Sequence, residues 1–123
     1  MNKITLSKID GAPSAGEILC SVDDLTDNAA MEFSLGSAKE TYDIFIQRYN
    51  GEIFAYVNVC PHAGTPLNME DGIFMEKTGR YLMCHTHGAL FEPSNGLCVA
   101  GPCNGASLQA VEIDIIAGNI VIL

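Results

Sequence analysis

The sequence predicts an all-β fold, and three observations lead to this prediction. Two segments rich in Ile, Phe, Tyr and Val, residues 41–49 and 52–59, flank Asn50-Gly51, the dipeptide most typical of a two-residue β-hairpin. Apolar residues alternate with acidic residues over 111–115, which indicates a strand with one buried face. Helices are expected to be short, with residues 22–25 and 66–69 as the candidates.

The remaining strands follow from similar signals further along the chain. Residues 79–83 lead as a strand into a loop that contains cysteine and histidine. Residues 89–92 and 97–99 are expected to pair as a second hairpin, because the turn residues Pro93-Ser94-Asn95-Gly96 separate them. After a glycine-containing turn the chain closes with an apolar strand at 120–123. Short strands joined in this way are typical of antiparallel sheets.

Length and cysteine content indicate one small domain in a reducing compartment. A chain of 123 residues is suited to a single domain with its own hydrophobic core. Residues 1–7 lack the apolar core of a signal peptide and a twin-arginine motif, and no apolar stretch is long enough to span a bilayer. Five cysteines, an odd number without an export signal, argue against a disulfide scaffold. We therefore expect a cytoplasmic protein.

The formal net charge of −9 argues against binding to nucleic acid or to anionic membranes, whose phosphates would repel the protein. The acidic residues gather in two groups: Glu17, Asp23, Asp24, Asp27 and Glu32, then Glu70, Asp71 and Glu76. They serve either solubility alone or the electrostatic steering of the protein toward a basic patch on a partner. The sequence leaves both interpretations open.

Two short motifs, Cys60-Pro61-His62 and Cys84-His85-Thr86-His87, contain all three histidines and two of the five cysteines. Thiol and imidazole groups are the ligands that transition metals prefer. The unequal spacings, Cys-x-His and Cys-x-x-His, favour ligands that go to different atoms of a binuclear cluster. A structural zinc site with two Cys and two His is the alternative, although zinc sites usually space paired ligands by at least two residues.

The residues around these motifs resemble the two cluster-binding loops of Rieske [2Fe–2S] proteins. The resemblance rests on 60–67 and 84–91, and on 96–102, which is similar to the family's third loop, where a Gly-Pro turn covers the cluster. The connection between the first two loops is somewhat longer than in compact family members. That difference lengthens one connection and leaves the ligand pattern unchanged.

The resemblance implies one [2Fe–2S] cluster, with Cys60 and Cys84 on one iron and His62 and His87 on the other. It also implies an antiparallel β-sandwich or barrel in which a cluster-binding part, about 58–103, is inserted into a base formed by about 1–57 and 104–123. A cluster held by four thiolates is a dianion. A cluster with two thiolates and two neutral imidazoles is neutral, so it accepts an electron more readily.

Four positions indicate where the reduction potential falls within the family. High-potential relatives carry a disulfide between the loops at the positions of Thr65 and Thr86, and this chain lacks it. They also carry a Ser and a Tyr, whose hydroxyls donate hydrogen bonds to sulfur, where this chain has Ala89 and Phe91. Because lost donors destabilise the reduced state, we expect a potential at the low end of the family range, about −150 mV.

The other thiols and the third histidine are not expected to be ligands. His85 lies between ligands, but the second-loop pattern selects His87, so we expect an exposed loop histidine; contact with a partner or proton coupling is the alternative. Cys98 and Cys103 flank the Gly-Pro turn, and Cys20 lies in an apolar segment. All three are expected to be thiols, although Cys98 and Cys103 are close enough in sequence for a disulfide.

The resemblance implies an electron-transfer protein and not an enzyme. We expect a Rieske-type ferredoxin that carries single electrons from a reductase to a terminal oxidoreductase such as a ring-hydroxylating oxygenase. The alternatives are the small subunit of a larger, nitrite-reductase-like enzyme and a zinc-stabilised interaction module. A complete oxygenase is excluded by counting, because its catalytic iron needs two histidines and a carboxylate, and only His85 remains once the cluster has its ligands.

Overall fold

The computed structural model describes residues 3–8, 11, 14–37, 41–61 and 64–123. Strands make up the regular structure of these residues, together with two single turns of 3₁₀ helix. The elements in chain order are β1 (Lys3–Ile4), η1 (Leu6–Lys8), β2 (Ile18–Ser21), η2 (Val22–Asp24), β3 (Ala30–Gly36), β4 (Thr41–Tyr49), β5 (Glu52–Val57), β6 (Leu82–Met83), β7 (Leu90–Phe91), β8 (Cys98–Ala100), β9 (Ala110–Val111), β10 (Ile113–Ile116) and β11 (Asn119–Ile122).

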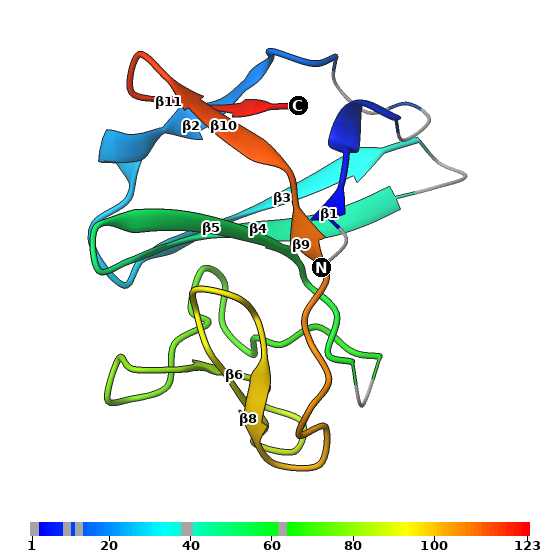
Figure 1. Ribbon diagram of the computed structural model, residues 1–123, viewed down its shortest axis with the longest axis vertical. Helices are drawn as coiled ribbons and strands as arrows, with labels where there is room; N and C mark the ends of the chain where they lie inside the picture. Colours follow the sequence, from blue (N-terminus) through cyan, green and yellow to red (C-terminus); the bar gives the residue numbers. More distant parts are fainter. Residues whose placement is uncertain (1–2, 9–10, 12–13, 38–40, 62–63) are drawn as a thin grey trace.

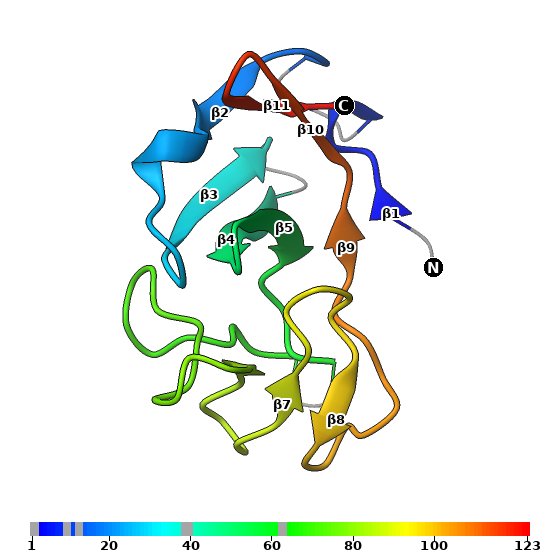
Figure 2. The same ribbon diagram turned by 60° about the vertical axis from the view of Figure 1, so that its left-hand side comes forward.

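Two sheets pack against each other in the upper part of the molecule (Figure 1). The larger one has the strand order β1-β9-β5-β4-β3 and is antiparallel except for the β1–β9 pair. The smaller one has the order β10-β11-β2 and lies above it (Figures 1 and 2). Buried side chains from both sheets, among them Ile44, Ile120 and Ile122, share one core. The prediction of an all-β, antiparallel fold is confirmed.

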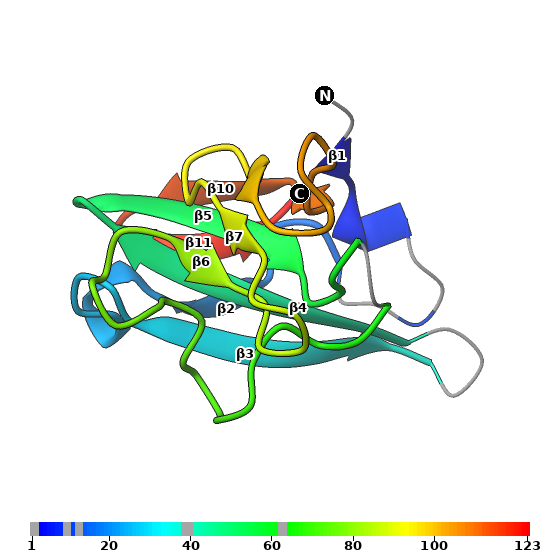
Figure 3. The ribbon, with the colours of Figure 1, turned by 90° about the horizontal axis from the view of Figure 1, so that it is seen from below.

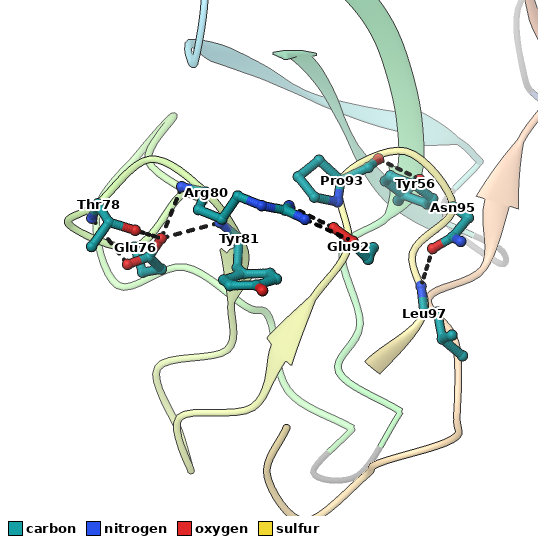
Figure 4. Close-up of polar contacts among 9 residues, drawn as sticks. All are labelled: Tyr56, Glu76, Thr78, Arg80, Tyr81, Glu92, Pro93, Asn95 and Leu97. Carbon is teal, nitrogen blue, oxygen red and sulfur yellow. Dashed lines mark hydrogen bonds and ion pairs between the residues drawn. The ribbon is translucent and has the colours of Figure 1, made fainter. Parts of the chain in front are cut away.

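A third sheet, with the order β6-β7-β8, lies on the opposite side of the larger sheet. Seen from below, it and its loops lie in front of β4 and β5 (Figure 3). A second core fills this interface, in which the rings of Phe45 and Phe74 stack with centroids 3.9 Å apart. The buried hydroxyl of Tyr56 in β5 donates to the carbonyl oxygen of Pro93 at 2.7 Å, which fixes the β7–β8 hairpin beneath the sheet (Figure 4).

Strand β4, which lies between β3 and β5, is buried on both faces over residues 44–47, and this burial explains the apolar run Ile44-Phe45-Ile46. Ile44 and Ile46 enter the core between the two upper sheets. Phe45, between them, enters the lower core, because successive side chains of a strand point to opposite faces. The same strand therefore supports both the upper sandwich and the layer that carries the cysteine loops.

The hairpin expected at Asn50-Gly51 is confirmed. Tyr49 and Glu52 are the last paired residues, and both loop residues have positive φ, 53° at Asn50 and 80° at Gly51. Such a turn matches the right-handed twist of the flanking strands. The second strand ends at Val57 and not at Val59, because the chain turns there toward the first cysteine loop.

The expected hairpin of 89–92 and 97–99 is also present, as β7 and β8. The expected strand at 79–83 is reduced to Leu82–Met83. The reason is the Glu76 carboxylate, which accepts hydrogen bonds from the amides of Thr78, Arg80 and Tyr81 and holds that segment as a turn (Figure 4). These hydrogen bonds, with one from the Thr78 hydroxyl as the first cause, lower the pKa of Glu76 to about 2.

The single strand expected over 111–115 is divided between two sheets. Ala110–Val111 pairs with β5 and β1, and Ile113–Ile116 pairs with β11. Glu112 lies at the change of sheet, where its carboxylate accepts from the Thr5 hydroxyl at 2.9 Å. The expectation of a buried Ile115 was wrong, since it is 48% exposed on an edge strand.

The two helix candidates had different outcomes. Residues 22–25 form the 3₁₀ turn Val22–Asp24, which Ser21 caps by accepting from the amide of Asp23. Residues 66–69 are not helical. Among the described residues, no helix has the length and apolar character needed to cross a membrane.

Candidate metal centre

The first cysteine loop begins directly after β5 and closes on itself through two backbone hydrogen bonds. The amide of Cys60 donates to the carbonyl oxygen of Thr65, and the amide of Gly64 donates to the carbonyl oxygen of Cys60, both at 2.8 Å. Gly64 has a φ of 71°, a left-handed conformation that glycine adopts at little cost. The loop therefore presents the Cys60 side chain from a closed turn.

The second cysteine loop, between β6 and β7, repeats this pattern at the same spacing. The amide of Cys84 donates to the carbonyl oxygen of Ala89 at 2.9 Å, and the amide of Gly88 donates to that of Cys84 at 2.8 Å. Gly88 has a φ of 73°. A Cβ atom at either loop glycine would meet nothing within 4 Å, so backbone conformation and not space requires glycine. Two loops of different sequence are thus closed by the same pair of backbone hydrogen bonds.

The two loops bring their thiols together in a buried, apolar part of the lower core. Cys60 is 2% exposed and Cys84 is 0% exposed, and both belong to the lower core. Burial, and then a hydrogen bond between the Cys84 and Cys60 side chains, raises the pKa of Cys84. A pair of soft sulfur donors at one buried point is a suitable binding site for iron or zinc.

The imidazoles occupy a different environment from the thiols. His87 lies three residues after Cys84 and is exposed, and His85 is exposed as well, as expected. His62, the fourth expected ligand, lies outside the described residues. The described part of the chain therefore holds three of the four expected ligands. Within that part, no group of three Cys, His, Asp or Glu side chains is arranged to hold an ion.

Three contacts join the two loops to each other and to the sheet above. The hydroxyl oxygens of Thr65 and Thr86 are 2.9 Å apart. The amide of His85 donates to the carbonyl oxygen of Leu67 at 2.9 Å. The amide of Leu67 in turn donates to Oδ1 of Asn58 at 2.8 Å. These contacts fix the separation of the loops.

Asn58 and Glu32 position the site, and sequence analysis did not identify either residue in this role. Asn58 is 5% exposed, and its Nδ2 donates to Oδ1 of Asn68 at 3.0 Å. Glu32 in β3 accepts from Nδ2 of Asn68 at 3.0 Å and from the amide of Gly72 at 2.7 Å. A polar residue at the end of an apolar strand, directly before a ligand motif, was the available signal for Asn58. Nothing local indicated Glu32.

The third loop follows β8 and packs on the second. A Cβ atom at Gly101 would lie 2.8 Å from the Cα of Ala89, so only glycine permits this approach. Cys98 and Cys103 are buried on either side of the Gly101-Pro102 turn, with their sulfur atoms 3.0 Å apart. None of the five cysteines, all within the described part of the chain, forms a disulfide.

A bidentate ion pair closes the outer side of this layer. The guanidinium of Arg80 contacts both carboxylate oxygens of Glu92, at 2.6 and 3.0 Å (Figure 4). The pair lowers the pKa of Glu92, first through the hydrogen bond from Arg80. It joins the turn before β6 to the end of β7, the two strands that flank the second cysteine loop.

Beside that loop lies an apolar groove of about 410 Å³. Its apolar walls are Met69, Ile73, Met75 and Met83, its charged rim is Glu70, Glu76 and Lys77, and His85 also lines it. Met69 is 78% exposed and Ile73 is 48% exposed. The groove is built largely from the long connection between the first two loops.

Comparison with known proteins agrees with this architecture. The family model of the Rieske [2Fe-2S] domain matches residues 17–115. A comparison with curated protein sequences gave no match.

Two solved ferredoxins are similar in structure. The ferredoxin of carbazole 1,9a-dioxygenase from Nocardioides aromaticivorans IC177 is 19% identical, with a TM-score of 0.68 over 89% of this chain and 97% of that one. A ferredoxin of Sphingomonas yanoikuyae B1 is 23% identical, with a TM-score of 0.61 over 86% of this chain and 95% of that one. At these identities the likeness shows the fold.

Proposed function

The chain belongs to the Rieske [2Fe–2S] family, and from this premise we propose that it is a one-electron carrier, a ferredoxin that passes electrons from a reductase to a terminal oxidoreductase such as a ring-hydroxylating oxygenase. The family's cofactor is one [2Fe–2S] cluster, which supplies a reversible one-electron couple when bound. We propose the cytoplasm as its location.

We propose that Cys60 and Cys84 bind one iron and that His62 and His87 bind the other. The contact between the two buried thiols and the exposure of His87 support this division. Thiolates in the apolar lower core are shielded from water. An exposed imidazole ligand leaves only a short path from the metal to a docked partner.

The observation that carries this proposal is the pair of matching loops, which hold two buried thiols in contact while the second loop stays at the surface. A deeply enclosed site would suit catalysis on a small substrate. A site whose second ligand loop lies at the surface suits electron exchange between proteins. One similar solved structure is a complex of the oxygenase and ferredoxin of carbazole 1,9a-dioxygenase, which supports an oxygenase as the class of acceptor.

The surface around the second loop supports a partner with a basic docking face. The groove beside His85 offers apolar contact, and Glu70 and Glu76 place negative charge on its rim. Asp71 adds a further exposed carboxylate. Opposite charge on the partner would speed association and allow fast release at physiological ionic strength.

Two measurements on purified protein test the proposal. Two iron atoms and two acid-labile sulfides per chain, with an EPR signal only after one-electron reduction, are the expected results for the cluster. One bound zinc ion and no sulfide would contradict it. Size measurement of the protein purified at native abundance then distinguishes a separate carrier from a subunit of a larger reductase.

A further inference from the structure

Cys98 and Cys103, which the proposed cluster does not use, form a close pair of thiols. Their sulfur atoms are 3.0 Å apart, and the thiol of Cys103 donates a hydrogen bond to the sulfur of Cys98. Cys98 is 1% exposed and Cys103 is 8% exposed, so apolar neighbours hold both side chains in place.

The backbone around the pair is already closed. The amide of Cys98 donates to the carbonyl oxygen of Ala106 at 2.8 Å, and the amide of Gly105 donates to that of Cys98 at 3.1 Å. The amide of Ala106 donates to the carbonyl oxygen of Cys103 at 2.8 Å. A bond between the two sulfurs would therefore order little additional chain, and the sulfurs need to approach by only about 1 Å to reach the length of a disulfide bond.

The loop that carries the pair also contacts the candidate metal centre. Gly101, between the two cysteines, packs on the backbone of Ala89 in the second ligand loop. Cys103 lies near enough to Cys60 for the two thiol groups to interact electrostatically. A covalent change at the pair would thus act on the loop that lies against the ligand loops.

We propose that Cys98 and Cys103 are a redox-active dithiol, which a small hydroperoxide such as hydrogen peroxide converts to a disulfide in the cluster-loaded protein and which a thiol reductant restores. In the first step the sulfur of Cys98 attacks one peroxide oxygen. The O–O bond breaks, Cys98 becomes a sulfenic acid and one water leaves. In the second step the sulfur of Cys103 attacks the sulfur of Cys98, the S–O bond breaks and a second water leaves. Two thiols lose two electrons and two protons, and the peroxide is reduced to two waters.

The roles within the pair follow from the direction of the hydrogen bond. The S–H group of Cys103 points at the sulfur of Cys98, which assigns the first attack to Cys98 and places Cys103 against the sulfur that it attacks in the second step. Because both side chains are buried, the oxidant has to be small.

Alkylation after acid quenching tests the proposal directly. Cluster-loaded protein is treated with a tenfold excess of hydrogen peroxide, quenched in acid, denatured, labelled with N-ethylmaleimide and digested with trypsin. The fragment that follows Arg80 contains no Lys or Arg and holds Cys84, Cys98 and Cys103. We expect its label count to fall from three to one and to return to three after reduction with dithiothreitol. The peroxide treatment should leave the visible absorbance of the cluster unchanged.

Cys20 provides an internal control, because it is 7% exposed but lies in the core between the two upper sheets. It should keep its label under the same treatment. In Cys98→Ser protein the same fragment should keep its label on Cys84 and form no internal disulfide. Three labels retained on the wild-type fragment would overturn the proposal. Loss of label in step with loss of cluster absorbance would also overturn it, because the disulfide would then involve a released ligand. Both of these outcomes are measured on wild-type protein, so the test remains decisive even if the Cys98→Ser variant does not fold.

Discussion

The side-chain hydroxyls of Thr65 and Thr86 lie 2.9 Å apart and join the first ligand loop to the second. Either oxygen can donate, and both residues follow their loop cysteines within a few positions. High-potential Rieske relatives have a disulfide at these positions, as the sequence resemblance implies. In this chain a hydrogen bond joins the two loops at these positions.

Replacing both threonines by cysteine should therefore create a disulfide with little movement of the backbone. The side chains already meet, and a disulfide requires the two sulfurs to come within about 2.05 Å. We expect the Thr65→Cys/Thr86→Cys variant to oxidise in air and to lose iron to a chelator several-fold more slowly than wild type. Absorbance during chelation measures the rate. The Thr65→Cys single variant is the control, and a double variant whose new thiols stay reduced in air and can be fully alkylated would contradict this prediction.

Gly101 should be the least replaceable glycine of the third loop. It has a φ of 97°, and a Cβ there would lie 2.8 Å from the Cα of Ala89, a backbone atom that cannot rotate away. Gly118, in the β10–β11 turn, has a φ of 79° with nothing within 4 Å of a Cβ. Gly118→Ala should cost only the backbone strain, about 1 kcal/mol. Gly101→Ala should cost clearly more and speed the release of iron. Thermal unfolding and chelation of both variants measure the difference, and equal effects would show that the close approach to Ala89 is unimportant.

The elements that could be predicted from sequence are those with local signals. Asn50-Gly51 specifies its hairpin through the backbone preferences of two residues, and the two cysteine loops are short motifs. The strand Ile18–Ser21 was not predicted, because it is a four-residue edge strand whose partner, β11, lies about 100 positions away. The strand Ala30–Gly36 was overlooked, although Met31, Phe33 and Leu35 alternate with polar residues and its partner β4 follows directly in sequence. The change of sheet at Glu112 depends on a contact with Thr5, which no local pattern reveals.

The same distinction holds for the site. Local sequence indicated the cysteine loops, and the structure brings Cys60 and Cys84 together. The support that Glu32 gives to Asn68 crosses 36 positions of sequence and could not be seen in one chain. The spacing of Cys98 and Cys103 permitted a contact between them, but only the folded third loop shows that their sulfurs meet.

Single substitutions should distinguish the proposed ligands from the neighbouring His85. Cys84→Ser and His87→Ala should give colourless, poorly folded protein, because a metal site of this kind contributes to folding. His85→Ala should keep the colour, since its side chain is exposed in the same loop and lies outside the ligand pattern. Iron content and visible circular dichroism measure the outcome. Full colour in His87→Ala, or loss of colour in His85→Ala, would show that the assignment of the second imidazole is wrong.

The groove beside the second loop should set the rate of electron transfer to a basic acceptor. Met69 and Ile73 are its most exposed apolar side chains, and Met69→Gln/Ile73→Gln would remove much of the apolar contact that a docked partner buries. A loss of about 1 kcal/mol corresponds to an approximately fivefold lower second-order rate. Stopped-flow reduction of cytochrome c, a basic haem protein, by the reduced carrier measures this rate.

A matched control and a salt series decide whether the effect belongs to docking. Ile116 is 56% exposed on β10, in the sheet on the far side of the molecule, and Ile116→Gln should leave the rate unchanged. The wild-type rate should fall as salt increases, because the acidic rim and the basic acceptor attract each other over about one Debye length. Exchange of the rim carboxylate Glu70 and the exposed carboxylate next to it, Glu70→Gln with Asp71→Asn, should flatten that salt dependence while the groove variant keeps it. If the groove variant and Ile116→Gln react at the same rate, the acceptor docks elsewhere on the protein.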